Sequence, residues 1–216
     1  MGAYTRLQAI NEMLLFSGET PVESLLNDSG VDTEIAGQIL DQKTLDAQSR
    51  GLANNITIRD FELGSDTILT LPSTIISAEM KTLVTAQSKH VEYARIVTRG
   101  WPATPKFFNL TDNTDIFKAG TYTAELILNV SWADMDTPIQ KDITTQAARQ
   151  YQMLTQGDGA VDNYLAQLEL FYGAKSKGSD VNSKGYNLFN LHNNASKATS
   201  RNIRHDRTKI RRWNTD

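Results

Sequence analysis

The chain has 216 residues, of which 39% are hydrophobic and 22% charged, an ordinary balance for a globular protein with room for one domain or two small ones. It has no run of about 18 apolar residues and no basic N-terminal segment followed by an apolar run, so neither a transmembrane helix nor a secretion signal is predicted. It contains no cysteine, which excludes disulfides and thiolate metal sites.

The formal net charge of −3 is unevenly distributed along the chain. From Ala195 onward there are seven Lys or Arg residues and two Asp residues, so this end carries +5 and the remainder carries −8. An acidic body with a basic end is typical of a protein that binds a partner, and it says nothing about the fold.

Two amphipathic helices are predicted near the N-terminus. Thr5 and Gln8 have the spacing of a capping box, and Gly18 followed by Pro21 predicts the end of the first helix. Asp32 is the predicted N-cap of the second. The apolar residues at helical spacing are Leu7, Ile10, Met13 and Leu14, then Ile35, Ile39, Leu40 and Ala47. Two helices alone have too little core, so we expect helices from later in the chain to cover them.

The middle of the chain, residues 54–136, has the pattern of a β-rich segment. Short runs of β-branched or aromatic residues are separated by Gly, Pro, Asn and Asp. The runs occupy residues 56–63, 67–71, 74–78, 82–86, 91–98, 107–110 and 121–130. Turns are expected at residues 64–66, 112–114 and 118–120. The pattern predicts a small antiparallel sandwich or barrel of roughly five to seven strands.

Two further helices are predicted over residues 137–177. The start signals of the third helix are Thr137 as N-cap, Pro138 at the first helical position and Gln140 closing a capping box. Asp158 is the predicted cap of the fourth helix, which we expect to end between Gly173 and Gly178. The predicted apolar stripes are Ile143, Ala147, Tyr151 and Leu154, then Val161, Leu165, Leu168, Phe171 and Tyr172.

These elements predict an α+β fold with three parts. Residues 1–53 and 137–177 are expected to form a four-helix bundle, with residues 54–136 inserted as the β domain. Residues 178–216 are predicted to be an extended basic C-terminal arm, because Asn, Ser, Lys and Arg dominate there. The candidate partner-binding residues of this arm are Tyr186, Leu188, Phe189, Arg201, Arg204, Arg207, Arg211, Arg212 and Trp213. A frayed terminus is the alternative interpretation.

The sequence offers little for catalysis or cofactor binding. It lacks a glycine-rich phosphate loop, a G-x-S-x-G elbow and an H-E-x-x-H motif. His90, His192 and His205 are scattered, and carboxylate pairs such as Asp134 with Asp136 occur in any helical protein. We therefore predict no catalytic residue, no metal site and no cofactor.

The basic C-terminal segment allows two kinds of partner. Its Lys and Arg residues could contact nucleic-acid phosphates. Its aromatic residues do not alternate with the basic ones, as they would in a base-stacking platform. Docking onto an acidic protein surface is therefore the favoured interpretation.

Short motifs in both halves of the chain carry a family resemblance. The segments are Ala9–Leu14 with Ser17–Leu25, Ala36–Leu40 with Gln48–Gly51, Ala147–Tyr151 and Tyr186–Leu188. In this order they resemble the tail tubular protein A family, the head-to-tail adaptors of short-tailed bacteriophages of the podovirus or autographivirus type. Leu52 stands where the family usually has Trp. The β region matches only in pattern, and residues 195–216 have no counterpart.

The resemblance implies a structural virion protein without catalytic residues. It implies a homo-oligomeric, twelve-subunit ring that forms part of the tail tube and joins the portal protein to the tail nozzle protein, with tail fibres as a further candidate partner. Genomic DNA would pass through the channel during ejection without sequence-specific binding, and no membrane would be involved. The implied location is the neck region of the virion tail, after assembly in the bacterial host cytoplasm.

Two alternative functions remain open at this point. A virion-associated peptidoglycan hydrolase would need two carboxylates in a cleft, one of them with a raised pKa. A free DNA-binding protein using the basic arm would show steeply salt-dependent binding.

Overall fold

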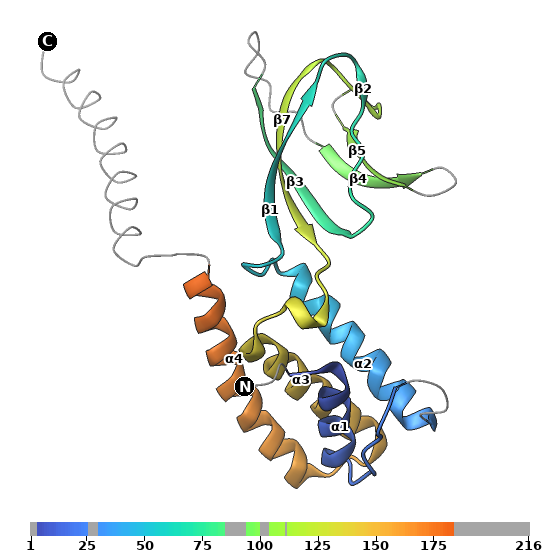
Figure 1. Cartoon of the computed structure of the whole chain (residues 1–216), viewed down its shortest axis with the longest axis vertical. Coiled ribbons are helices and arrows are strands. Elements are labelled where there is room, and N and C mark those ends of the chain that lie inside the picture. Colours follow the sequence, from blue (N-terminus) through green and yellow to red (C-terminus); the bar gives the residue numbers. More distant parts are fainter. Residues whose placement is uncertain (1–3, 26–29, 85–93, 100–103, 111, 184–216) are drawn as a thin grey trace, which may run out of the picture.

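The structure is a computed structural model that describes residues 4–25, 30–84, 94–99, 104–110 and 112–183. Within these residues the chain is a mixed α+β protein, with four α-helices at one end of an elongated molecule and the strands at the other (Figure 1). The helices are α1 (Arg6–Phe16), α2 (Gly30–Ser49), α3 (Thr137–Thr155) and α4 (Gly159–Ser183), with a short 3-10 helix η1 (Trp132–Asp134) before α3. The strands are β1 (Ile56–Leu63), β2 (Thr67–Ile68), β3 (Ile75–Val84), β4 (Ala94–Arg99), β5 (Thr104–Asn109), β6 (Ile116–Phe117) and β7 (Gly120–Leu128).

The start of α1 is capped as the sequence predicts. The Thr5 side chain accepts from the Gln8 backbone N–H, and the Gln8 side chain accepts from the Thr5 backbone N–H. Gly18 follows the helix with a φ of +68°, a left-handed conformation that glycine adopts without strain. The predicted N-cap of α2 is wrong, because the helix already includes Gly30 and Asp32 lies in its first turn.

The predicted capping box of α3 is also wrong. The N-cap is Asp136, which makes no side-chain capping bond, and Thr137 is the first helical residue. Gln140 is buried, and its Nε2 donates to the carbonyl oxygen of Trp132 instead of bonding back to the N-cap. The Asp136 carboxylate is occupied as well, since it accepts from the Ser179 hydroxyl of α4. A contact with the preceding 3-10 helix and a contact with α4 therefore replace the local cap.

Helix α4 is longer than expected. It continues through Gly173 and Gly178 to Ser183, and neither glycine has a positive φ. Its last turns contact the connection between the two ends of the molecule, where the Asp180 carboxylate accepts from the Ala53 backbone N–H at 2.6 Å. This anchorage accounts for the continuation of a helix that two glycines would otherwise weaken.

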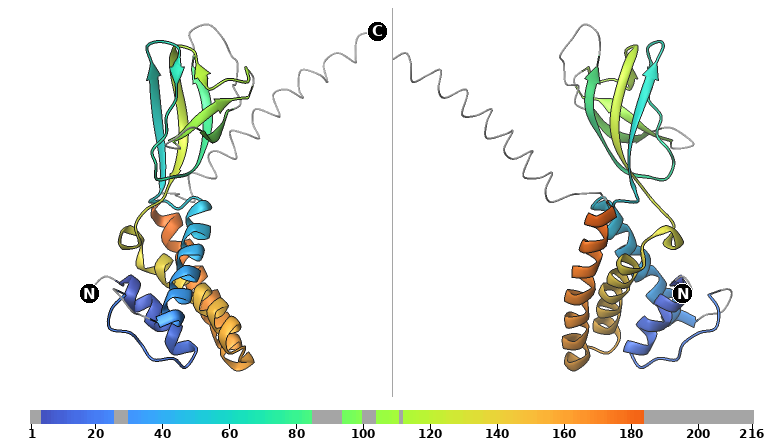
Figure 2. Two further views of the ribbon diagram at one scale, coloured as in Figure 1. Left: turned by 90° about the vertical axis from the view of Figure 1, so that its right-hand side faces the viewer. Right: turned by 60° about the vertical axis from the view of Figure 1, so that its left-hand side comes forward.

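Helices from both ends of the sequence contribute to one hydrophobic core, and α3 contacts each of the other three (Figure 2). The buried residues are Ala9, Ile10, Met13, Leu14, Ala36, Ile39, Leu40, Met135, Ile139, Ile143, Ala147, Ala148, Tyr151 and Leu165. Most of them belong to the predicted stripes. Ile35, Leu154 and Phe171 do not follow the prediction: they are 38%, 68% and 51% exposed, because they lie where no described element covers them.

The strands form a three-stranded sheet in the order β1-β7-β3 and two two-stranded sheets, β2-β6 and β4-β5, all antiparallel. β3 is one strand where the sequence indicated two runs, and a register irregularity between Met80 and Thr82 lies between them. A second core lies on one face of the larger sheet, around Leu69, Leu71, Phe107, Phe117, Tyr122, Ala124 and Leu126. The sandwich or barrel architecture itself remains a prediction.

Two connections join the helical end to the strands, and side-chain amides hold them together. Gln48 Nε2 donates to the Val130 carbonyl at 3.0 Å, and the Val130 N–H donates to Gln48 Oε1 at 2.8 Å. Asn55 Nδ2 donates to the Gln48 carbonyl, and its Oδ1 accepts from the Leu52 N–H. The buried Gln48 amide thus joins the outgoing chain to the returning chain, and the Asn55 amide stabilises the turn of the outgoing chain.

Candidate interaction surface

The nine partner-binding residues predicted from the sequence, between Tyr186 and Trp213, lie outside the described residues, and so do His90, His192 and His205. Their roles stay predictions. The carboxylate pair does lie in a described segment: Asp134 accepts from the Ser131 hydroxyl and Asp136 from Ser179. Both carboxylates therefore make structural contacts around the start of α3.

The N-terminal motif residues hold the first loop against the helices. Asn11 Nδ2 donates to the Val22 carbonyl, and Asn11 Oδ1 accepts from the Val22 N–H, both at 2.9 Å. The Glu19 carboxylate accepts from the Tyr151 hydroxyl at 2.7 Å. Burial, reinforced by this bond, raises the pKa of Tyr151, so the phenol is a permanent donor at neutral pH.

Glu12 is the acceptor of a second polar cluster. It accepts from the Tyr4 hydroxyl and pairs with the Lys141 ammonium, which also lies 3.9 Å from the centroid of the Tyr4 ring. Trp132 Nε1 donates to the Tyr4 carbonyl. Burial and the bond to Glu12 raise the pKa of Tyr4. The cluster fastens the segment before α1 to α3 and η1.

Arg149 links α3 to α4. Its Nε donates to Asp162 Oδ1 at 2.6 Å and its Nη1 to Glu169 Oε2 at 3.0 Å. The hydrogen bonds to Asp162 and Glu169 raise the pKa of Arg149, and the bond from Arg149 lowers the pKa of the Asp162 carboxyl. Arg149 therefore acts as a fixed cation whose charge is already compensated.

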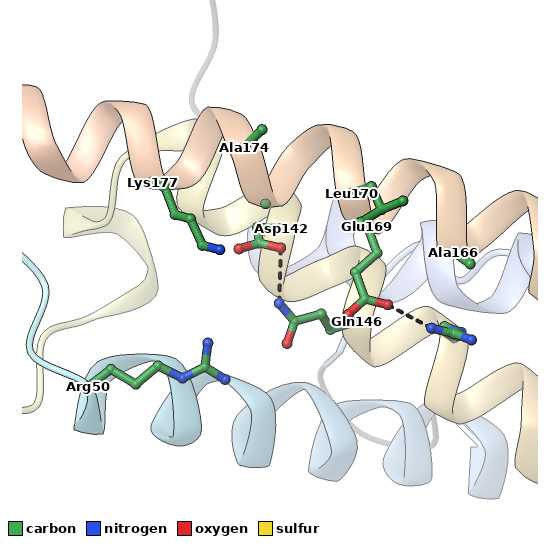
Figure 3. A pocket seen from close by; sticks show the side chains of 10 residues that line it. Arg50, Asp142, Gln146, Ala166, Glu169, Leu170, Ala174 and Lys177 are labelled. Atoms are coloured by element: carbon green, nitrogen blue, oxygen red, sulfur yellow. Dashed lines mark hydrogen bonds and ion pairs between the residues drawn. The ribbon is translucent and has the colours of Figure 1, made fainter.

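Beside this ion pair, a groove runs between α2 and α4 with α3 as its floor (Figure 3). Its volume is about 640 Å³, and it adjoins a second hollow of about 370 Å³ that shares Gln146, Arg149 and Glu169. The lining residues of the larger hollow are Arg50, Asp142, Gln146, Arg149, Ala166, Glu169, Leu170, Gly173, Ala174 and Lys177. The smaller hollow adds Lys43, Gln150, Met153 and Asp162.

Cations line both walls of the groove. Arg50, the residue directly after α2, and Lys177 of α4 extend into the space beside Asp142 (Figure 3), and both are exposed. Neither side chain, nor Lys43, makes an ion pair with another residue in the described part of the chain. Asp142 accepts from Gln146 Nε2 on the floor. Arg50 belongs to the Gln48–Gly51 motif, but nothing in the sequence placed it opposite Lys177.

Many large apolar side chains of the helices are exposed. They are Leu15, Val31, Ile35, Leu45, Met153, Leu154, Tyr164, Leu170, Phe171 and Val181. Leu170, on the wall of the groove, is 78% exposed. These side chains are distributed over all four helices.

Among the described residues, the features of other site types are missing. No group of three or more His, Asp or Glu among them could hold a metal ion, and none of their helices is both long and apolar enough to span a membrane. A hydrolytic general acid needs a raised pKa, whereas the pKa of Asp162 is lowered.

The profile of the tail tubular proteins matches residues 7–186, which is most of the chain. The chain belongs to the tail tubular protein family. This membership confirms the resemblance carried by the sequence motifs, and it makes the protein a structural component of a bacteriophage tail. The match extends past the end of α4, to Tyr186.

Two other comparisons accompany the family match. A chain from the solved structure of the virion of a native gene transfer agent particle is 14% identical, with 79% of this chain and 93% of that chain covered. The TM-score is 0.28, which supports no conclusion about fold or function. None of the curated proteins compared matches the chain.

Proposed function

We propose that this tail tubular protein is the head-to-tail adaptor of its virion, a ring that joins the portal protein to the tail nozzle and forms part of the DNA channel. The observation that carries the proposal is the family match over residues 7–186. In this proposal the helices act as a four-helix bundle that makes the side-by-side contacts of the ring. The strands act as a small sandwich or barrel facing the nozzle, and the arm docks on the portal.

The exposed apolar side chains of the helices support side-by-side assembly. A cyclic ring needs two different, complementary surfaces on each subunit, and apolar residues are exposed on all four helices. The strand end exposes fewer such residues among those described: Ile58, Ile68, Leu110 and Ile116. The helical end is therefore the better candidate for the permanent contacts within the ring.

Net charge supports a channel through which DNA slides. Twelve chains at −3 each carry a formal −36, and an acidic lumen repels phosphates instead of binding them. The basic arm, with its +5, would then lie away from the lumen, on the portal.

Native mass measurement tests the proposal. We expect the native mass of the chain alone to be far below that of a twelve-subunit ring. We expect the chain mixed with portal protein to give a complex whose added mass equals twelve copies of 24.1 kDa. A mixture in which the chain and the portal stay separate at micromolar concentration would contradict the adaptor role.

The hydrolase alternative is not proposed, because no observation favours it over a structural role. A peptidoglycan zymogram with the purified chain provides its direct test, and a cleared band would restore it.

A further inference from the structure

We propose that the groove between α2 and α4 receives the outer face of α2 from an adjacent copy of this chain. The inference rests on the proposed ring and names the two surfaces that would build it. One surface is the groove of Figure 3 with its adjoining hollow, and the other is the outer face of α2, defined by its exposed residues Val31, Asp32, Glu34, Ile35, Gln38, Asp41, Gln42, Leu45, Asp46 and Ser49.

The groove has the chemistry of an acceptor for acidic side chains. Its own carboxylates Asp162 and Glu169 already pair with Arg149, and Asp142 is bonded to Gln146. The cations of its walls, Arg50, Lys177 and Lys43, have no such partner among the described residues. An incoming carboxylate would complete their pairing, while the exposed Leu170 would contact apolar groups beside it.

The outer face of α2 has the complementary chemistry. Its exposed residues include the carboxylates of Asp32, Glu34, Asp41 and Asp46 and no Lys or Arg. Asp41 is paired with Arg6, and the other three make no ion pair with any residue that the structure describes. The apolar residues Val31, Ile35 and Leu45 are exposed on the same face, with Leu45 50% exposed. The opposite face of the helix packs into the helical core. A helix with exposed apolar and acidic residues is suited to a groove between two other helices.

The arrangement repeats without change around a ring. Because α2 is a wall of the groove on one side and presents its outer face on another, each copy can offer one surface to the neighbour before it and the other to the neighbour after it. Such a heterologous contact closes into a ring when the rotation per subunit allows it. In this contact Leu45, on the outer face of α2, is paired with Leu170, on the wall of the groove.

Cysteine pairs test the contact cleanly, because the chain has no native cysteine. Full-length Leu45→Cys and Leu170→Cys chains are mixed, assembled on the portal and oxidised. We expect covalent dimers from the mixture, ladders of several chains from the double variant, and no dimer from either single variant. The control is Ile58→Cys on β1, at a residue that is 67% exposed, which should not cross-link to Leu45→Cys.

Charge reversal gives a second readout of the same contact. Arg50→Glu with Lys177→Glu should reduce ring yield at least tenfold, and Glu34→Lys with Asp46→Lys on the same chain should recover most of it. Circular dichroism of each unassembled variant separates loss of contact from loss of fold.

The outcomes distinguish this contact from the ring itself. Dimers from either single variant, or rings without cross-links, overturn the groove assignment and leave the adaptor proposal standing. A photo-crosslinker on Leu170→Cys that labels the portal also overturns it, by showing a different occupant. If wild-type chains form no ring on the portal, the adaptor proposal and the contact both fall.

Discussion

At the scale of residues, the charged and amide side chains of the family motifs make structural contacts within the fold. Asn11, Glu12 and Glu19 bind the loop and the segment before α1 to the helices, Gln48 joins the two connections, and Arg149 pairs α3 with α4. Burying a charged or amide group costs little free energy only when the group forms hydrogen bonds or an ion pair. Each of these side chains does so.

Gly51 occupies the junction in a conformation that other residues rarely adopt, with a φ of +79°. A Cβ there would lie 3.1 Å from Ile56 Cδ1. Gly51→Ala should therefore lower the free energy of unfolding by about 1–2 kcal/mol. Gly64→Ala is the matched control, since its φ is not positive and its Cβ would meet nothing within 4 Å. Urea denaturation that gives equal stabilities for both variants would contradict the assignment.

The bond from Arg149 gives Asp162 a pH signature. Its pKa is lowered in the folded state, so the stabilisation is present above the unfolded pKa of about 3.9 and is lost as the pH falls through the folded pKa. Asp162→Asn should lower the melting temperature at pH 7, and its difference from wild type should shrink below about pH 4. Arg149→Gln also removes the bond to Glu169, so it should lower the melting temperature further, and adding Asp162→Asn to it should have little further effect. A difference that stays constant from pH 7 to pH 2 would refute this explanation.

At the scale of elements, capping residues in the sequence correctly predicted the helix starts that are held by hydrogen bonds within a few residues. The capping box at Thr5 and the Asp158 cap, whose Oδ1 accepts from the Ala160 N–H at 2.7 Å, are confirmed. The predictions at Asp32 and Thr137 are wrong. At Thr137 the helix starts one residue too early for the predicted capping box, and the Gln140 side chain bonds to Trp132 in η1 while the Asp136 carboxylate bonds to Ser179 of α4.

The candidate site was less predictable than the fold. Periodicity in the sequence indicates which residues face the core, but it does not say which helices leave a hollow between them. Arg50 and Lys177 are separated by the whole β region in sequence and lie on the two walls of one groove only because α2 and α4 flank α3.

The two glycines inside α4 provide a test at this scale. A Cβ at Gly173 would lie in ordinary contact, 3.6 Å from Asp142 Oδ1, and one at Gly178 would meet nothing within 4 Å. Gly173→Ala and Gly178→Ala should each raise the free energy of unfolding by about 0.5–1 kcal/mol, because alanine loses less backbone entropy in a helix. Gly157→Ala should destabilise instead, since its φ is +66°. Thermal unfolding in which all three variants behave alike would contradict the helical placement.

At the scale of the whole molecule, the predicted C-terminal arm can be tested by a truncation that leaves every described helix intact. Ser179, Asp180 and Ser183 contact Asp136 or Ala53, so a truncation should keep residues up to Ser183. We expect this variant to keep its melting temperature and to lose at least tenfold in portal affinity, measured by sedimentation or surface plasmon resonance.

Two variants separate the arm's charges from its apolar residues. One replaces the five arginines from Arg201 to Arg212 by glutamine, and the other replaces Tyr186, Leu188, Phe189 and Trp213 by alanine. Electrostatic docking predicts that the first loses affinity mainly at low salt, and apolar anchoring predicts a loss from the second that salt does not change. Portal binding unaffected by the truncation itself would remove the arm from the mechanism.

The central claim is the position of this tail tubular protein in the virion, and electron cryomicroscopy of intact particles tests it most directly. We predict a ring of twelve copies directly beneath the portal, with DNA or an open channel at its centre and the nozzle below. Density for this chain at another position in the tail, or a neck in which portal and nozzle meet without it, would contradict the account.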